Sequence, residues 1–423
     1  MISTKVLPSG VKVAVSSMKG FEGVSFKMYV FTGSANESKI ENFGISHLIE
    51  HMFFKGTKTR SSLDIVKEFD ANGIQTNAYT SKNETCYFTY GTGDSLEKSA
   101  EIMSDMLFNS AFDETELKRE KEVVVEEIKM YQDKPDAVCE MLMDANFFAG
   151  TNYAHDIAGS EDGVRKISRQ QILDYYNTHY IPQNIILSFA GNVTSEKAIS
   201  LVEKYFEPKF EKQKEQSEST KQDAFEIVKK QHILQKNTNQ AQLMISFKTE
   251  NRFNRKKLAI NTLISQMLGG SMGSRLFQEV REKLGLVYTI NSYNDVSPLT
   301  GMFSISLGTS LSKVKLALKT IKKVLDEVCQ NGFNQNELTL AKNSIISVLK
   351  LRSDSPSNMA SNIAFQLRYR NKIHSKKSQI KEYEVITLED VNNGAKDIFL
   401  KDYVITMVGN KDDFNLIRIF EKK

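Results

Sequence analysis

Cysteine is scarce in this chain of 423 residues, and its three copies, Cys86, Cys139 and Cys329, lie far apart. An odd number of cysteines without a C-x-x-C pair indicates neither a disulfide framework nor a cysteine metal site. We therefore expect a protein of a reducing compartment. The cytoplasm fits best, and an organelle matrix is the alternative.

Long apolar runs are also missing. No stretch approaches the roughly 20 apolar residues that a membrane-spanning helix needs. The first 15 residues, MISTKVLPSGVKVAV, alternate as a strand does and lack the long apolar core of a signal peptide. The sequence therefore predicts a soluble protein that has no membrane span and is not exported.

Charge of one sign is not concentrated anywhere. Lys and Arg number 56 against 52 Asp and Glu, which leaves a net charge of +4 without long blocks of one sign, so nucleic acid is not an expected partner. Hydrophobic residues at 40% and charged residues at 26% are typical of a globular protein. A chain of this length favours two domains or more.

A polar segment divides the chain almost in half. Residues 207–223 (EPKFEKQKEQSESTKQD) are nearly free of apolar side chains and have no periodicity, as expected of an exposed linker. We therefore predict a first domain at 1–210, a linker at 211–223 and a second domain at 224–423.

The same landmarks recur in both halves, in the same order. The helical pattern at 47–53 (HLIEHMF) matches 262–268 (TLISQML), at an offset of 215 residues. The helix start at 112–117 (FDETEL) matches 333–338 (FNQNEL), at an offset of 221 residues. The last strand of each half ends on a Gly-Asn pair, and these pairs are 218 residues apart. Near-constant offsets in three kinds of element indicate a duplication.

Strand and helix patterns alternate within each half. The runs at 85–90 (TCYFTY) and 302–307 (MFSISL) are typical of half-buried strands. At 311–328 the apolar residues fall on one helical face, and Gly332 follows where a C-terminal cap is expected. The sequence predicts an α+β fold of two duplicated domains, each an antiparallel-rich sheet with helices packed on it.

A His-x-x-Glu-His motif, His47, Glu50 and His51, lies in an amphipathic stretch that starts near Gly44. Residues at i, i+3 and i+4 share one face of a helix, so both imidazoles can bind a single ion. Glu50 lies between them, where its carboxylate could take a proton from water held by the metal. The same order is the inverzincin signature. Alone, however, such a histidine pair is more often a surface or core feature.

A catalytic zinc site usually has three protein ligands, so a further ligand should come from elsewhere in the chain. The long helix expected between Asp113 and Pro135 is the obvious source. It carries Glu120 and Glu127, which are about two turns apart and share a face. A helix this rich in Glu, Lys and Arg is also typical of a solvated face with i, i+4 pairs.

The duplication provides an internal control. At the offsets given above, the second half carries Thr262, Ser265 and Gln266 in place of the motif, and Ala341 and Val348 in place of the two glutamates. Every suspected site residue is thus able to bind a metal in one copy only, whereas the apolar framework persists in both. A requirement of the fold would not produce that asymmetry.

At these motifs the chain resembles the pitrilysin family of metallopeptidases, in particular the half-length subunits that include the mitochondrial processing peptidases and their bacterial relatives. The resemblance runs along nearly the whole chain. Its segments are GISHLIEHMFFKGTKTR, NAYT followed by ETCY, REKEVVVEEIKMYQDKP and RLFQEVREKLGLVY. It implies that His47, His51 and Glu127 ligate zinc, that Glu50 is the general base, and that Glu120 supports the site without binding the metal.

The resemblance also implies how substrate is held. The edge strand around Asn77, Ala78 and Tyr79 would pair with extended peptide backbone, the β-augmentation mode of peptide capture. From the second half, Arg281 and Tyr288 resemble the family's pair that reaches the substrate carbonyl. The alternatives are a surface ion pair for Arg281 and a core strand position for Tyr288.

One segment departs from the family pattern. Where many relatives carry a His-Pro-like sequence, residues 152–155 read NYAH. We expect this difference to affect a loop and not the site. We interpret His155 as a structural or surface residue, and the same interpretation applies to His179, His232 and His374.

The resemblance implies a zinc endopeptidase that hydrolyses unfolded or extended peptides, with water activated by the metal and Glu50 as general base. It implies a dimer around a chamber, with the second domain as an inactive wall. Two alternatives remain open. The chain could be the active subunit of a heterodimeric processing peptidase, or a non-catalytic assembly subunit, although such subunits have typically lost part of the motif.

Overall fold

The structure is a computed structural model, and it describes residues 2–210, 225–411 and 413–422. The chain forms two compact units. The first unit holds Met1–Lys129, His155–Thr220 and Leu351–Ile373, and the second holds Met130–Ala154, Lys221–Lys350 and His374–Lys423. Within the described ranges, no helix is both long enough and apolar enough to cross a membrane.

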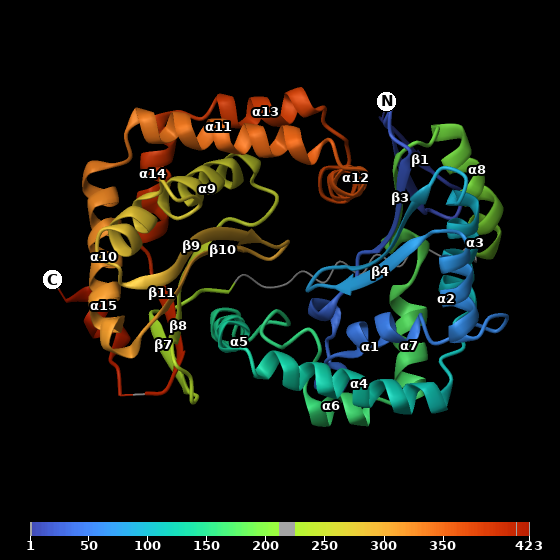
Figure 1. Cartoon of the computed structure of the whole chain (residues 1–423), viewed down its shortest axis with the longest axis horizontal. Helices are drawn as coiled ribbons and strands as arrows, with labels where there is room; N and C mark the ends of the chain where they lie inside the picture. The colour runs from blue at the N-terminus through green and yellow to red at the C-terminus, as the bar shows by residue number, and fades with distance from the viewer. Residues whose placement is uncertain (1, 211–224, 412, 423) are drawn as a thin grey trace. The chain divides into compact units, whose positions relative to one another are not determined.

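A six-stranded sheet forms the centre of the first unit (Figure 1). Its strands are β1 (Ile2–Val6), β2 (Lys12–Ser17), β3 (Gly23–Val30), β4 (Gln75–Thr80), β5 (Thr85–Thr92) and β6 (Ile185–Gly191). Their order is β1-β2-β6-β3-β5-β4, and only the β2–β6 pair is parallel. The strand β4 is therefore an edge strand, and it pairs with β5 alone among the described strands.

Helices cover one face of this sheet. They are α1 (Ile45–Met52), α2 (Ser62–Ala71), α3 (Leu96–Asn109), α4 (Glu114–Gln132), α6 (Glu161–Lys166), α7 (Arg169–His179) and α8 (Ser195–Tyr205). In α1 the apolar residues Ile45, Leu48, Ile49 and Met52 recur at helical spacing and are fully buried in the core beneath the sheet. This spacing turns the side of α1 that carries Glu50 and His51 away from the core.

A helix from the second half of the sequence, α12 (Pro356–Arg370), packs on the opposite face of the first sheet. Its residues Ile363 and Ala364 are fully buried in one cluster with Tyr29 of β3. The Tyr29 hydroxyl also donates to Ser361 Oγ at 2.9 Å. In Figure 1 α12 is orange and β3, on which it packs, is blue, because the two are far apart in the sequence.

The second unit receives a helix from the first half of the sequence in return, α5 (Pro135–Phe147). Its Cys139 Sγ donates to the Gln242 carbonyl at 3.4 Å. The compact units therefore differ by these two helices from the contiguous domains expected at 1–210 and 224–423. The expected linker, 211–223, lies outside the described residues.

The sheet of the second unit has five strands. They are β7 (Lys230–Gln235), β8 (Ala241–Thr249), β9 (Val287–Val296), β10 (Gly301–Thr309) and β11 (Tyr403–Gly409). Their order is β7-β11-β8-β10-β9, and only the β7–β11 pair is parallel. The edge strand β9 thus corresponds to β4 of the first unit.

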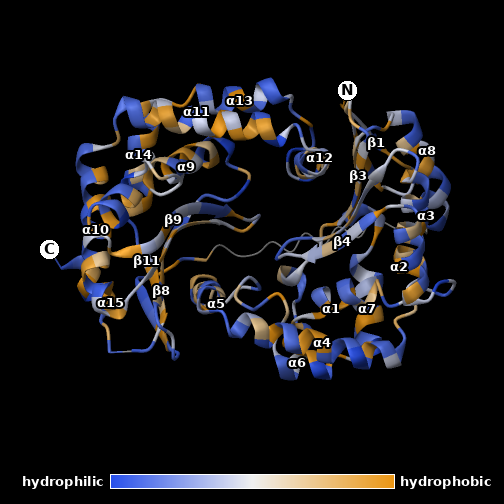
Figure 2. Ribbon diagram, in the orientation of Figure 1, coloured by the Kyte–Doolittle hydropathy of each residue, from blue (hydrophilic) through white to orange (hydrophobic). Residues whose placement is uncertain are grey.

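The remaining helices of the second unit are α9 (Arg255–Leu268), α10 (Val314–Asn331), α11 (Gln335–Arg352), α13 (Lys376–Glu384), α14 (Leu388–Phe399) and α15 (Leu416–Glu421). Blue and orange alternate along α10 in Figure 2, because its buried residues, from Val314 to Val328, recur on one face. The helix ends at Asn331, and the following Gly332, with a φ of 74°, provides the expected cap.

The duplicated α+β fold is confirmed. Without β1, the order β2-β6-β3-β5-β4 repeats as β7-β11-β8-β10-β9, with its single parallel pair in the same place. The helix α1 corresponds to α9, and α4 corresponds to α11, which matches the offsets found in the sequence.

Candidate metal centre

The helix α1 carries both histidines of the motif on its side away from the core. It begins after Gly44, whose φ of 96° is in the left-handed region that glycine adopts readily. The spacing of four residues brings the rings of His47 and His51 together, with centroids 4.6 Å apart. Their positions are thus set by the helix itself.

Glu127 of α4 completes a group of three donors. Its Oε2 atom lies 3.7 Å from His47 Nε2 and 3.4 Å from His51 Nε2. The three donor atoms lie within 4.8 Å of one another, and no other such group of His, Cys, Asp or Glu occurs in the described parts of the chain.

These separations suit a tetrahedral metal ion. Ligands bound to zinc at about 2.0–2.1 Å in tetrahedral geometry are separated by roughly 3.3–3.4 Å. The two distances from Glu127 Oε2, 3.4 and 3.7 Å, are close to that value. Two imidazoles and a carboxylate are also the donors of many catalytic zinc sites, in which a fourth position is left for water or substrate. The residues present therefore fit zinc.

Glu120 lies behind this group and contacts His51 from the opposite side of the ring. Its Oε1 atom is 2.9 Å from His51 Nδ1, and its Oε2 atom is 2.7 Å from Lys55 Nζ. Glu120 is 5% exposed, and the ammonium of Lys55 offsets its buried charge. Because His51 Nδ1 is held by Glu120, Nε2 of the same ring is directed at Glu127.

The two histidines have opposite pKa shifts in the metal-free protein. Burial lowers the pKa of His47 to about 4, and the neighbouring His51 acts in the same direction. Burial also acts against charge on His51, but contacts with Glu120 and Glu127 outweigh it and raise the pKa of His51 to about 9. In the metal-free protein, burial therefore disfavours a proton on His47, whereas the two carboxylates favour one on His51.

Glu50 is not part of this donor group, and its carboxylate bonds to the edge strand. Thr80 Oγ1 of β4 donates to Glu50 Oε2 at 2.6 Å. Burial raises the pKa of Glu50 above its usual range, although the hydrogen bond from Thr80 acts in the opposite direction. A carboxylate with a raised pKa beside a metal site is a candidate proton acceptor.

The predicted substrate residues Asn77, Ala78 and Tyr79 all lie on the edge strand β4. Tyr79 is 37% exposed. The backbone N–H of Ala78 donates to the side chain of Asn77 at 2.8 Å, so this group has a partner within β4 itself. The strand β4 also contacts α1, which places it beside the motif within the same unit.

The predicted residues Arg281 and Tyr288 belong to the second unit, where they lie close to each other. Arg281 is part of the π-helical turn Phe277–Glu282, and its guanidinium carbon is 5.8 Å from the ring centre of Tyr288. Tyr288 is 72% exposed, so it is not the core residue that one alternative required. The nearest carboxylate oxygen to Arg281, on Glu282, is 4.0 Å away, at the limit of an ion pair.

The second unit repeats the geometry of the centre without its metal donors. Ser265, at the position of Glu50, donates to the Ser292 carbonyl of the edge strand β9 at 2.8 Å. Gln266, at the position of His51, donates to Ser344 of α11 at 3.2 Å. In the second unit a serine hydroxyl therefore makes the contact between helix and edge strand that Glu50 makes in the first unit. A glutamine amide makes the contact between helices that His51 makes there.

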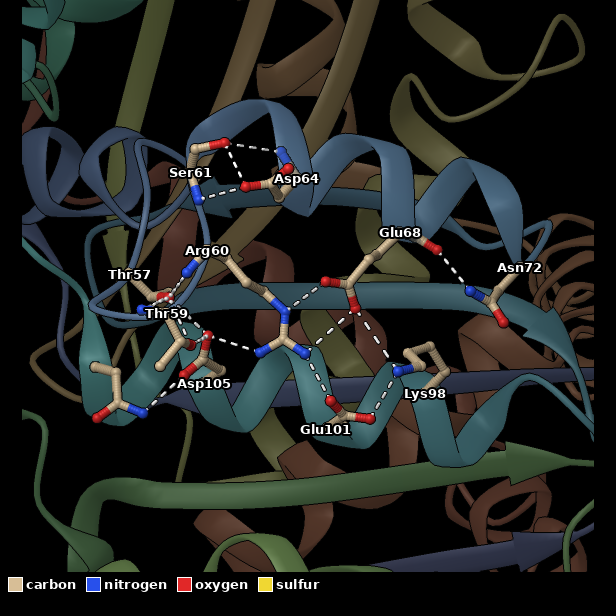
Figure 3. Close-up of polar contacts among 11 residues, drawn as sticks. Thr57, Thr59, Arg60, Ser61, Asp64, Glu68, Asn72, Lys98, Glu101 and Asp105 are labelled. Carbon is tan, nitrogen blue, oxygen red and sulfur yellow. Dashed lines mark hydrogen bonds and ion pairs between the residues drawn. The ribbon is translucent and has the colours of Figure 1, made fainter.

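The segment that follows α1 is held by a network of polar contacts (Figure 3). Asp105 of α3 is buried, and its Oδ2 accepts hydrogen bonds from Thr57 at 2.7 Å and from Arg60 at 2.8 Å. The Arg60 guanidinium also binds Glu68 of α2 at 2.9 Å and Glu101 of α3 at 2.6 Å. A single arginine thus ties the chain after α1 to two neighbouring helices.

The structure adds residues that the sequence interpretation missed. Thr80 holds Glu50, and Lys55 holds Glu120. The period of two in a strand was a usable signal for Thr80, because it places Thr80 on the same face of β4 as Ala78. His155, for which the sequence indicates a structural or surface role, hydrogen bonds to Glu37 beside the start of α1. No sequence signal pointed to that contact.

Comparisons with known proteins agree along nearly the whole chain. Residues 12–161 match the family model described as insulinase (peptidase family M16), and residues 166–345 match the peptidase M16 inactive domain. An uncharacterized zinc protease of Bacillus subtilis, YmxG, is 33% identical over 408 residues, which cover 96% of this chain and 98% of that protein.

Solved structures share the fold at lower identity. A protease from Helicobacter pylori has a TM-score of 0.90 at 21% identity and covers 97% of this chain and 99% of its own. A chain of complex III2 from Candida albicans has a TM-score of 0.85 at 16% identity and covers 99% of both chains. The match to the family models and to YmxG shows that this chain belongs to peptidase family M16, the pitrilysin family.

Proposed function

We propose that this chain is a zinc-dependent endopeptidase that hydrolyses peptide bonds in unfolded or extended peptides. The observation that carries the proposal is the group of His47 Nε2, His51 Nε2 and Glu127 Oε2, whose atoms lie within 4.8 Å of one another. Membership of the M16 family and the name zinc protease of its relatives support the same conclusion.

In this proposal His47, His51 and Glu127 hold the metal, and Glu120 fixes the ring of His51. Zinc, when bound, supplies a Lewis acid that acidifies water and polarises the peptide carbonyl. Glu50 accepts the proton from that water and later delivers it to the leaving amine. Burial of Glu50 favours this role, because a raised pKa makes its carboxylate a better base near neutral pH.

The edge strand β4 is the proposed peptide-binding element. A peptide backbone that pairs with Asn77, Ala78 and Tyr79 would extend the sheet by one strand. To do so it would replace the hydrogen bond between the Ala78 N–H and the Asn77 side chain. Backbone pairing of this kind needs an extended substrate, which excludes the interior of folded proteins.

The second unit has two proposed roles. Arg281 and Tyr288 would donate hydrogen bonds to the developing oxyanion, for which the first unit offers no obvious donor. The described residues of this unit contain no group of three metal donors, so the rest of the unit would act as an inactive wall of a substrate chamber, in a dimer of two such chains. The 72% exposure of Tyr288 supports a role in binding and not in packing.

Two other functions compete with this one. The chain could be the active subunit of a heterodimer that needs a related partner to bind substrate. It could also be a non-catalytic assembly subunit, since a chain of complex III2 from Candida albicans shares the fold. The fold does not distinguish these functions, but the intact donor group favours an active enzyme.

The deciding experiment uses the purified chain alone. We expect one zinc per chain, cleavage of an unstructured peptide, and loss of both after treatment with a chelator. His51→Ala should lose the metal. Glu50→Gln should keep it but lower kcat by about 100-fold or more, because the proton acceptor is gone. Glu126→Gln, an exposed change on α4, is the matched control.

One contrary outcome would select an alternative function, and two others would refute parts of the proposal. A zinc-loaded chain that is monomeric and inactive, and that gains activity with a related partner, would support the heterodimer. A zinc content that His51→Ala leaves unchanged would refute the metal site itself. Near-normal hydrolysis by Glu50→Gln would refute the general-base role, whatever the metal content.

A further inference from the structure

The helix α1 begins without a capping side chain of its own. Its N-cap residue is Gly44, which has no side chain to accept from the first free N–H groups of the helix. A distant carboxylate supplies both acceptors. Glu37 Oε2 accepts from the Gly44 N–H at 2.8 Å, and Glu37 Oε1 accepts from the Ser46 N–H at 2.9 Å.

Glu37 is fully buried, and a histidine pairs with its charge. His155 Nε2 lies 3.0 Å from Glu37 Oε2, and the side chains of these two residues are 10% and 0% exposed. The His155 ring stacks on Phe43, with centroids 3.6 Å apart and an interplanar angle of 5°. The carboxylate therefore has three hydrogen-bond partners, which a buried charge requires.

Backbone packing fixes the two segments against each other. A Cβ atom on Gly44 would lie 2.5 Å from the Ala158 carbonyl oxygen, and one on Gly159 would lie 2.4 Å from the Phe43 carbonyl oxygen. No side chain fits between them. The loop that carries His155 is thus held in direct backbone contact with the residues that precede α1.

The segment that ends at Glu37 is anchored as well. The N–H groups of Ser34 and Ala35 donate to the carbonyls of Ser81 and Lys82, in the turn between β4 and β5, at 3.1 and 2.8 Å. The Lys82 ammonium donates in turn to the His155 carbonyl. The segment that carries Glu37 is therefore held both by the turn between β4 and β5 and by the loop that carries His155.

We propose that Glu37, held by His155, is a positioning residue that sets the start and the rotation of α1 and so aims His47 and Glu50. Ser46 immediately precedes His47, and Glu50 follows one turn later. A negative charge at a helix N-terminus is also favourable, because the free N–H groups there carry partial positive charge. The effect on metal binding rests on the proposed function. The hydrogen bonds of Glu37 to the start of α1 do not depend on it.

The first test measures the metal-free protein, so it does not depend on the proposed function. In Glu37→Gln the side chain keeps one oxygen and gains an NH2 group. The Gly44 and Ser46 N–H groups bond to different oxygens of the carboxylate, so one of them would face this NH2 donor. We expect amide hydrogens in residues 44–52 to exchange at least about tenfold faster than in the wild type. Glu41→Gln, an exposed change in the same connection, should leave the exchange unchanged.

The second test reads the geometry of the ligands. Co²⁺ bound to the protein reports its ligand arrangement by visible absorption, and competition with a chelator gives the Zn²⁺ affinity. In Glu37→Gln we expect altered Co²⁺ bands and Zn²⁺ affinity reduced by about 10-fold or more, as for other residues that orient ligands. We expect kcat to fall while KM stays close to the wild-type value, because β4 is intact.

His155→Phe keeps the ring on Phe43 but removes the bond to Glu37, so it tests the proposal if Glu37→Gln does not fold. It should produce the same kinds of change in amide exchange, Co²⁺ bands and Zn²⁺ affinity, each smaller than in Glu37→Gln. Wild-type exchange in residues 44–52 and wild-type Co²⁺ bands in both variants would overturn the proposal. A wild-type protein that binds no zinc would instead overturn the proposed function, and the exchange of the metal-free variants would still decide the role of Glu37.

Discussion

Thr80 Oγ1 donates a hydrogen bond of 2.6 Å to Glu50 Oε2, so the last residue of β4 holds the carboxylate that lies between the two histidines of α1. The neighbouring residues of the same strand are the proposed peptide-binding positions. An incoming peptide would therefore pair with the element that orients the proposed base. The second unit repeats this contact between helix and edge strand with Ser265 and the Ser292 carbonyl.

Replacing Thr80 by Val should lower kcat by roughly 10- to 100-fold. The change keeps the shape of the side chain but removes a hydrogen bond to a charged group, which typically contributes about 1.5–3 kcal/mol. Zinc content should not change, because Thr80 contacts none of the proposed ligands. Steady-state kinetics with an unstructured peptide, together with metal analysis, measures both.

Thr80→Ser, which restores the hydroxyl, should recover most of the lost activity. Thr339→Val is the matched control, because Thr339 bonds only to a carbonyl of its own helix. If Thr80→Val keeps full activity, the hydrogen bond does not contribute to catalysis.

Glu120→Gln should weaken zinc binding by about 10- to 100-fold, as changes behind a metal ligand commonly do. The amide keeps a similar shape but removes the charge that holds His51 Nδ1 and Lys55. Competition with a chromogenic chelator measures the affinity. Glu116→Gln, on the same helix but paired with the exposed Arg119, is the control. Unchanged affinity in Glu120→Gln would mean that His51 needs no support from Glu120.

Tyr288→Phe and Arg281→Ala test whether the second unit contributes to catalysis. Loss of one oxyanion donor typically lowers turnover by about 100-fold or more, whereas loss of a surface ion pair has little effect. Lys283→Ala, which breaks an exposed ion pair with Glu279 in the same segment, is the control. Folded, zinc-loaded variants with wild-type kcat would leave the second unit only the role of a wall.

Asp105→Asn should reduce stability in a manner that depends on pH. Burial opposes ionisation, but hydrogen bonds from Thr57, Asn109 and Arg60 outweigh it and hold the pKa of Asp105 below its usual value of 3.8. The stabilisation is therefore complete above about pH 4 and is lost as the pH falls through the lower pKa of the folded state.

At pH 7 we expect Asp105→Asn to lower the free energy of unfolding by roughly 1–3 kcal/mol. Glu68 and Glu101 remain on Arg60, which limits the loss. The difference from the wild type should shrink towards pH 3. Denaturant unfolding at several pH values measures it, and the exposed Asp94→Asn is the control. A difference that stays constant from pH 7 to pH 3 would contradict the prediction.

Much of the fold was predictable because it follows from local periodicity. The helical spacing of Ile45, Leu48 and Met52 and the alternation at 85–90 are visible in the sequence, and α1 and β5 lie where they predict. The exchange of α5 and α12 between the units was not predictable. Both helices are amphipathic whichever sheet they cover, so periodicity does not reveal which sheet buries them.

The sequence by itself determined the two histidines and their shared helix face, because their spacing of four residues is a local property of the chain. It also limited the third donor to a helix that carries Glu120 and Glu127. The spacing of these two glutamates does not distinguish them, and only the family resemblance gave them different roles. The tertiary structure supplies the physical difference, since Glu127 Oε2 lies near both Nε2 atoms and Glu120 contacts His51 Nδ1. The contacts of Thr80 with Glu50 and of Glu37 with α1 and His155 were likewise decided by tertiary packing, because they join segments whose distance in space no sequence pattern encodes.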